Sequence, residues 1–131
     1  MAVRLLDTNI VSFSLRRHPL AAKYRPHLAG HSLAISFMTV AELYEGAALA
    51  SWGRGRIARM EATLRGYVIV ESDPDVCRWW AAVRAQRHRQ PIATADAWIA
   101  ASALAYGLEL VTHNPADFAG IPGLTVVTEA P

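Results

Sequence analysis

Apolar positions along the chain follow two alternating patterns, short continuous runs and longer stretches with helical spacing. Runs typical of buried strands occupy residues 3–6, 33–36, 67–70, 108–112 and 124–127. Stretches with helical spacing or helix-capping residues lie between them, at residues 10–15, 20–28, 39–50, 54–64, 74–88 and 94–105. This alternation predicts an α/β fold in which a mainly parallel sheet of four to five strands lies between two layers of helices.

Three local predictions concern single side chains. Thr39 is expected to be the N-cap of the helix at residues 39–50, and Asp73 to cap the next-to-last helix, with Pro74 at its first position. Cys77 is expected to be a small core side chain on that helix. As the single cysteine of the chain it cannot form an internal disulfide, which fits a reducing compartment.

Composition adds a little to this picture. The 131 residues fit one domain, residues 1–131, and 53% hydrophobic content argues against disorder. No apolar run reaches the roughly 18 residues of a membrane span and no signal peptide is visible, so we expect a cytoplasmic protein without a membrane partner. Of the 13 basic residues all but Lys23 are arginine, a bias that leans toward nucleic acid and is also expected from a GC-rich genome.

Two acidic residues occupy positions with more than one interpretation. Asp7 follows the first strand directly, and ligand crevices of open α/β sheets lie at the carboxyl ends of strands. The same Asp7-Thr8-Asn9 tripeptide is also a good N-cap cluster. Glu42 lies opposite the centre of the apolar stripe of its helix, so it points either to solvent or into a cleft; a first-turn Glu favoured by the helix dipole is the structural alternative.

Two further acids come from the C-terminal half. Asp96 belongs to the helix at residues 94–105, which is apolar almost all round and is therefore expected to be buried centrally. No basic residue lies three or four positions away, and an unpaired buried carboxylate is costly, so a functional role is favoured for Asp96. Asp117 lies in the turn after residues 108–112 and would by itself be an ordinary turn acid.

A parallel sheet would gather these four acids at one edge. Four carboxylates in a small volume repel one another and cannot all remain ionised unless a cation lies between them. Hard carboxylate oxygens without His or Cys partners select Mg²⁺ or Mn²⁺. The sequence therefore predicts a magnesium or manganese site at the carboxyl ends of the strands.

Four segments in this order and spacing, which together cover nearly the whole chain, resemble the PIN-domain ribonucleases, specifically the VapC toxins of type II toxin–antitoxin systems. They are Leu5-Leu6-Asp7-Thr8-Asn9, the segment at residues 36–43 with Gly46, the segment at residues 95–101, and the segment at residues 111–118. The resemblance implies a PIN-like three-layer α/β/α fold in which Asp7, Glu42, Asp96 and Asp117 are the metal-binding and catalytic acids. It matches the surrounding polar positions to Thr8, Asn9, Thr112 and Asn114.

The resemblance also implies an activity and partners. A Mg²⁺-dependent endoribonuclease is expected, one that hydrolyses phosphodiester bonds of tRNA, rRNA or mRNA and leaves 5′-phosphate and 3′-hydroxyl ends. A cognate antitoxin would block the acidic site, and toxins of this type usually form homodimers. Trp52, Trp79 and Trp80 are candidates for such partner surfaces, although core packing explains large aromatics more often.

Two other functions are alternatives to a ribonuclease. A phosphatase with Asp7 as nucleophile, of the haloacid-dehalogenase type, would have a second Asp two positions on, where this chain has Asn9. A non-catalytic PIN-like module that binds RNA or protein is the alternative of a different class, and four retained acids argue against it. No Gly-rich run ends in Gly-Lys-Ser/Thr, so a nucleotide-binding P-loop is excluded.

Overall fold

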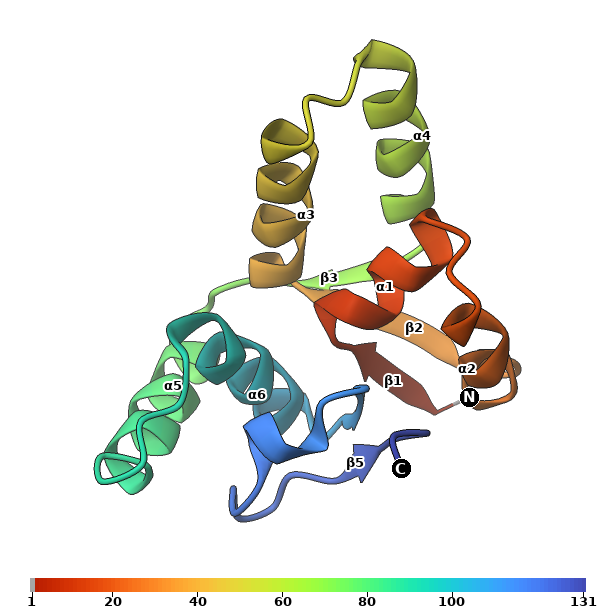
Figure 1. The fold of residues 1–131 in the computed structure, drawn as a ribbon. Coiled ribbons are helices and arrows are strands. Elements are labelled where there is room, and N and C mark those ends of the chain that lie inside the picture. Colours follow the sequence, from red (N-terminus) through yellow and green to blue (C-terminus); the bar gives the residue numbers. More distant parts are fainter. Residues whose placement is uncertain (1) are drawn as a thin grey trace.

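Five parallel strands form the centre of the computed structural model, which describes residues 2–131, and helices cover both faces of the sheet (Figure 1). The strands are β1 Val3–Leu6, β2 Ser32–Ser36, β3 Val68–Val70, β4 Glu109–Val111 and β5 Val126–Val127, in the spatial order β3-β2-β1-β4-β5. Each neighbouring pair is parallel. The predicted three-layer α/β/α architecture is confirmed.

The helices follow the predicted order with small shifts at their ends. They are α1 Thr8–Leu15, α2 Leu20–Leu28, α3 Phe37–Leu49, α4 Arg54–Leu64, α5 Pro74–Gln86 and α6 Thr94–Tyr106, and a short 3-10 helix, η1, spans Pro115–Phe118. As the apolar helix pattern predicted, α6 is central, with Ala97 and residues 99–103 buried. No helix in the described part of the chain is long and apolar enough to cross a membrane.

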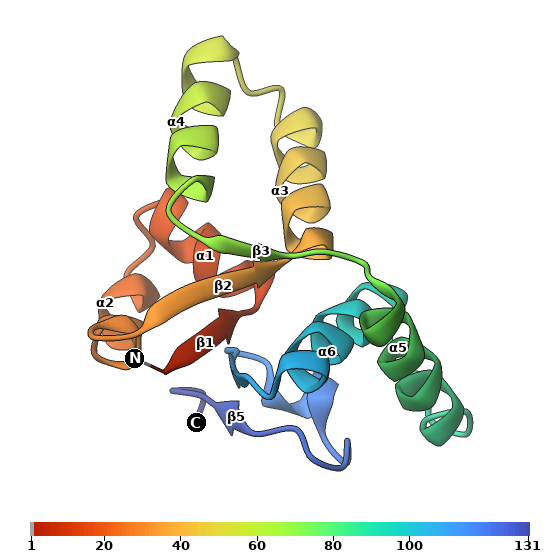
Figure 2. The same ribbon diagram turned by 180° about the vertical axis from the view of Figure 1, so that it is seen from behind.

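Alternate side chains of the strands fill two separate cores. Leu5 and Leu110 face α5 and α6, whereas their neighbours Leu6 and Val111 face α1, α2, α3 and α4. This two-sided burial is why the strands read as continuous apolar runs and not as an alternation of apolar and polar residues. Figure 2, seen from behind, shows α5 and α6 together on one face of the sheet, with α1 to α4 on the other.

Two of the local predictions are wrong, and Asp73 alone behaves as expected. The N-cap of α3 is Ser36, whose Oγ accepts the Met38 N–H at 3.1 Å, because the helix begins directly at the end of β2. Thr39 therefore lies inside the first turn, where it is fully buried. Cys77 is exposed, because the inward face of α5 is set by Val76 and Val83, and Cys77 points about 100° away from Val76. Asp73 caps α5 as predicted.

Candidate active site

Asp7 lies at the junction of the two central strands. Its backbone N–H donates to the Val111 carbonyl at 2.9 Å, which holds the end of β1 against the end of β4. The side chain is only 6% exposed, and its two oxygens accept hydrogen bonds from the Thr8 N–H at 2.8 Å and the Thr112 hydroxyl at 2.7 Å. Asp7 therefore caps α1, as one interpretation of the tripeptide predicted. Its buried carboxylate also lies at the strand ends, and its catalytic role stays a prediction.

Glu42 is joined to this strand end by a hydroxyl. Thr8 Oγ1 donates to Glu42 Oε1 at 2.7 Å and lies 3.0 Å from Thr39 Oγ1. The side chain of Glu42 is half-buried and lines a cavity together with Thr8 and Asn9. Of the two orientations that the sequence left open, Glu42 thus has the one that faces a cleft.

Asp96 lies in the first turn of α6 with its carboxylate half-buried. Burial, followed by the negative charges of Asp7, Asp117 and Glu42, raises its pKa to about 6. The ion pairs of the described residues join Arg4 to Glu109, His27 to Glu129 and Arg78 to Asp75, so no cation of residues 2–131 offsets the charge of Asp96. The sequence predicted that a group from outside the helix would satisfy this carboxylate, and no ion pair of the described residues does so.

Asp117 is an exposed residue of η1 that belongs to the same electrostatic group. Its negative charge helps to raise the pKa of both Asp7 and Asp96. The turn that carries it is fixed by the Asn114 N–H, which donates to Thr112 Oγ1 at 3.0 Å. The Asn9 and Asn114 side chains are exposed next to the acids, whereas Thr8 is half-buried and Thr112 is buried. The four acids named from the sequence are thus brought together at one edge of the sheet.

The four acids are of the residue type that binds divalent cations, but their oxygens do not converge on one point. Among residues 2–131, no three side chains of His, Cys, Asp or Glu converge closely enough to hold an ion directly. Burial raises the pKa of Asp7, and the charges of Glu42 and Asp117 add to that effect against the two hydrogen bonds that lower it. Burial and neighbouring negative charges disfavour the ionised form of these carboxylates. A hard cation bound to their oxygens would offset that effect, so the residues present fit a divalent metal.

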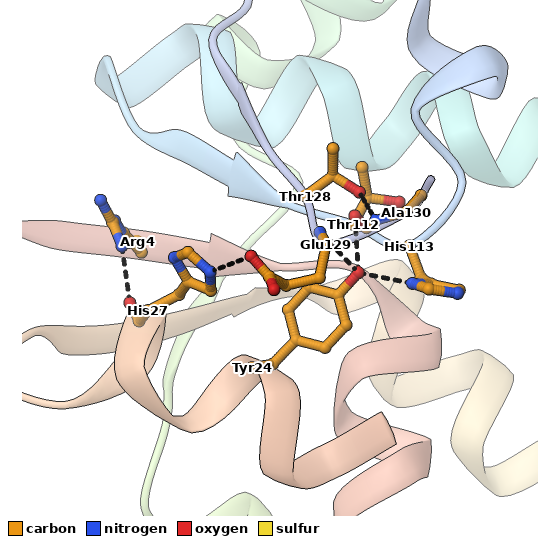
Figure 3. Close-up of polar contacts among 8 residues, drawn as sticks. All are labelled: Arg4, Tyr24, His27, Thr112, His113, Thr128, Glu129 and Ala130. Carbon is orange, nitrogen blue, oxygen red and sulfur yellow. Dashed lines mark hydrogen bonds and ion pairs between the residues drawn. The ribbon is translucent and has the colours of Figure 1, made fainter. Parts of the chain in front are cut away.

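A hydrogen-bond network between α2, the end of β4 and the C-terminal residues was not predicted from the sequence (Figure 3). Tyr24, buried on α2, places its hydroxyl 2.5 Å from His113 Nδ1, and accepts the Glu129 N–H at 3.1 Å. His27 Nε2 lies 2.8 Å from Glu129 Oε2. The C-terminal tail is thereby fastened beside Thr112, the residue that hydrogen-bonds Asp7. No periodicity or motif marks Tyr24 for this role, because its partners lie about 90 and 105 residues away.

The aromatic residues expected at partner surfaces differ from one another. Trp79 is 41% exposed on α5. Trp80 is half-buried and stacks on Trp98, with ring centroids 4.8 Å apart. Trp52 is half-buried between α3 and α4, and the Arg56 guanidinium lies 4.1 Å from its ring centre. Of these three tryptophans, Trp79 is the one that is exposed to solvent in the described chain.

Comparison with known proteins assigns the chain to a family. The PIN domain family matches residues 4–124. Ribonuclease VapC2 of Haemophilus influenzae is 34% identical over 116 residues, 87% of this chain and 88% of that protein. The tRNA(fMet)-specific endonuclease VapC of Shigella flexneri is 30% identical over 122 residues, 92% of each chain. The chain therefore belongs to the PIN-domain family, and within it to the VapC ribonucleases.

A solved structure agrees with this assignment. The crystal structure of DNA-bound VapBC from Salmonella typhimurium contains a chain that superposes with a TM-score of 0.85 at 28% identity and covers 98% of both chains. VapC nucleases of the PIN family generally depend on a divalent metal, which is the kind of ion that the four acids fit.

Proposed function

We propose that this chain is the toxin of a type II toxin–antitoxin system, an endoribonuclease that hydrolyses RNA phosphodiester bonds with Mg²⁺ or Mn²⁺ in its acidic site. The observation that carries the proposal is the group of four acids at one edge of the sheet, in which burial and then the charges of neighbouring acids raise the pKa of Asp7 and of Asp96. Concentrated negative charge repels RNA unless a metal is present, so a metal-dependent nuclease explains it better than a bare binding module does.

Asp7 and Asp96 would be the principal ligands, with Glu42 and Asp117 completing the set. Thr112 and the Thr8 N–H hold the Asp7 carboxylate in one orientation, and the Thr8 hydroxyl fixes one oxygen of Glu42. A divalent ion bound by these oxygens supplies an activated water and a countercharge for the leaving oxygen. The fixed carboxylates leave no need for a Ser, Cys or His nucleophile, and the products would carry 5′-phosphate and 3′-hydroxyl ends.

The proposed substrate is single-stranded or loop RNA, because its bases are unstacked and its phosphates are accessible to a site on the protein surface. Relatives are named ribonuclease VapC2 and tRNA(fMet)-specific endonuclease VapC, which supports RNA as the substrate class. Solved VapBC complexes of similar chains support a cognate antitoxin as the inhibiting partner. We further propose a homodimer, a cytoplasmic location and a single PIN domain over the whole chain.

The test compares the intact protein with Asp96→Asn and with the control Asp75→Asn, an exposed acid on α5. Each is expressed inducibly and also purified and incubated with total RNA, Mg²⁺ and then EDTA. The proposal expects growth arrest and new 5′-phosphate ends with the intact protein and the control, and neither with Asp96→Asn or EDTA. Binding of RNA without cleavage by all three proteins would instead establish the non-catalytic module.

A further inference from the structure

A cavity lined by arginines lies beside the acidic site, between the end of α1 and the helix α4. It has a volume of about 440 Å³, and its lining includes Arg16 and Arg17 of the α1 end and Arg56 and Arg59 of α4. Trp52 and Met60 form part of its wall. Figure 1 shows that the end of α1 approaches α4, so the two arginine pairs come from segments about forty residues apart in the sequence.

These four guanidinium groups are not neutralised within the protein. Inside residues 2–131 the arginines that form ion pairs are Arg4 and Arg78, both outside this cavity. Glu61 is the acid of α4, and one of its oxygens accepts the Tyr44 hydroxyl at 2.6 Å. Four exposed positive charges around one hollow favour an anionic ligand with several charges.

The arginine cavity continues into the acidic site. A second hollow, of about 510 Å³, is lined at one end by Thr8, Asn9 and Glu42. Its other end is lined by Arg16, Trp52 and Arg56, the same residues that line the first cavity. The two hollows therefore adjoin, and together they form what we call the arginine groove, which leads from Glu42 to the four arginines.

Arg56 stacks on Trp52 in this groove. Its guanidinium carbon lies 4.1 Å from the centre of the Trp52 ring, the geometry of a cation–π stack. Trp52 is in turn anchored by its backbone N–H, which donates to the Ala47 carbonyl at 3.0 Å. A guanidinium stacked on an aromatic ring keeps its donors free at the edge and loses less freedom when it binds a phosphate.

We propose that the arginine groove binds the phosphates of the RNA strand that flank the scissile bond, with Arg16 and Arg56 as phosphate ligands and Trp52 as a positioning residue for Arg56. This inference rests on the proposed ribonuclease function. A ligand that fills the groove must cross both carboxylates and arginines, and an RNA strand meets both needs because its scissile phosphate requires the metal acids and its neighbours require cations. An acidic peptide would gain from the arginines alone and be repelled by Glu42.

The test measures binding without cleavage. In the Asp96→Asn background, a fluorescein-labelled uridine dodecamer is titrated by anisotropy with Arg16→Ala/Arg56→Ala and with the control Arg78→Ala/Arg89→Ala, which removes the same charge from the α5 side. We expect about tenfold weaker binding for the groove variant and less than twofold for the control. Because each single-strand phosphate contact contributes about 0.7 to the slope of log K against log salt, the groove variant should lose about 1.4 of that slope. Equal losses in both variants, or an unchanged slope, would overturn the proposal.

The role of Trp52 has its own comparison. Trp52→Leu removes the ring on which Arg56 stacks, whereas Trp52→Phe retains an aromatic face. We expect Trp52→Leu to bind the dodecamer several-fold more weakly, with near-normal binding in Trp52→Phe and in the control Trp79→Leu. Equal weakening by Trp52→Leu and Trp52→Phe would reject the stacking role.

Two further results would distinguish failure of the groove proposal from failure of the proposed ribonuclease function. If the otherwise intact protein cleaves RNA and the groove variants bind normally, the groove proposal fails alone. If binding depends on the arginines but the intact protein never cleaves RNA, the ribonuclease function fails, and the groove with it as a substrate site. A labelled polyglutamate that binds as tightly as the RNA, with no effect of Trp52→Leu on either, would assign the groove to an acidic protein partner.

Discussion

The Thr112 hydroxyl donates a 2.7 Å hydrogen bond to Oδ2 of Asp7, across the line where β4 meets β1. Burial raises the pKa of Asp7, and this bond is the largest of the effects that lower it. In Thr112→Val the lowering is lost, so Asp7 should ionise only at higher pH. We expect the acid limb of kcat/KM for RNA cleavage to move to higher pH, and the matched change Thr125→Val at an exposed position to leave it in place. An unmoved acid limb in Thr112→Val would show that this bond does not tune the site.

Asp96 should make the metal-free protein less stable as pH rises. Its pKa is raised from 3.8 when unfolded to about 6 when folded, so the folded state binds the proton more tightly. The contribution of Asp96 to stability is therefore greatest below about pH 4 and is lost as pH rises through about 6. After allowance for solvent screening, Asp96→Asn should be about 1 to 2 kcal/mol more stable than the parent at pH 8 and converge with it near pH 4. Urea unfolding in EDTA across this range measures the difference, and a parent more stable than Asp96→Asn at pH 8 would contradict it.

Addition of Mg²⁺ should reverse that instability. A ligand that binds only the folded state at about a hundred times its Kd contributes about 2.7 kcal/mol, which raises the melting temperature by several degrees. We expect this rise for the intact protein and for Asp75→Asn, and none for Asp7→Asn/Asp96→Asn. Scanning calorimetry with Mg²⁺ and with Mn²⁺ measures it. An equal rise in all three proteins would place the ion elsewhere.

The Tyr24 hydroxyl should stabilise the fold from behind the site. It is buried, lies 2.5 Å from His113 Nδ1 and accepts the Glu129 N–H, so Tyr24→Phe leaves those groups without their partner. We expect a loss of about 1 to 2 kcal/mol in the free energy of unfolding by urea at pH 7. The control Tyr44→Phe, at an exposed site, should change the free energy by less than about 0.5 kcal/mol. Equal effects would mean that the network does not anchor the tail.

Much of the fold could be predicted from the sequence because burial dictates it. Strands covered on both faces are mostly apolar, with Arg4 of β1 and Glu109 of β4 as a charged pair, and α6, packed against the sheet and α5, is apolar almost all round. The Thr39 prediction failed because two residues with capping side chains lie three positions apart, and only the tertiary end of β2 decides that Ser36 is the cap. The position of Cys77 depends on the rotation of α5 about its axis, and the inward stripe of that helix is set by few residues.

Of the candidate site, only the acidic residues stood out in the sequence. A carboxylate among apolar residues, such as Asp96, is visible in the chain because nothing nearby compensates it. The side chains that orient the acids are ordinary residues in the sequence: Thr8 and Thr112 reach their roles through bonds to Glu42 and Asp7, 34 and 105 positions away. The arginine groove likewise joins the end of α1 to α4, and no local pattern connects them.

The central position of β1 has a consequence for the order in which the molecule is completed during synthesis. β1 pairs with β2 on one side and with β4 on the other, and β4 comes more than a hundred residues later. A nascent chain therefore carries Asp7 and Glu42 long before the strand that brings Thr112 and the turn of Asp117. The four acids meet only when residue 117 has left the ribosome, so the acidic site is assembled long after its first acid has been synthesised.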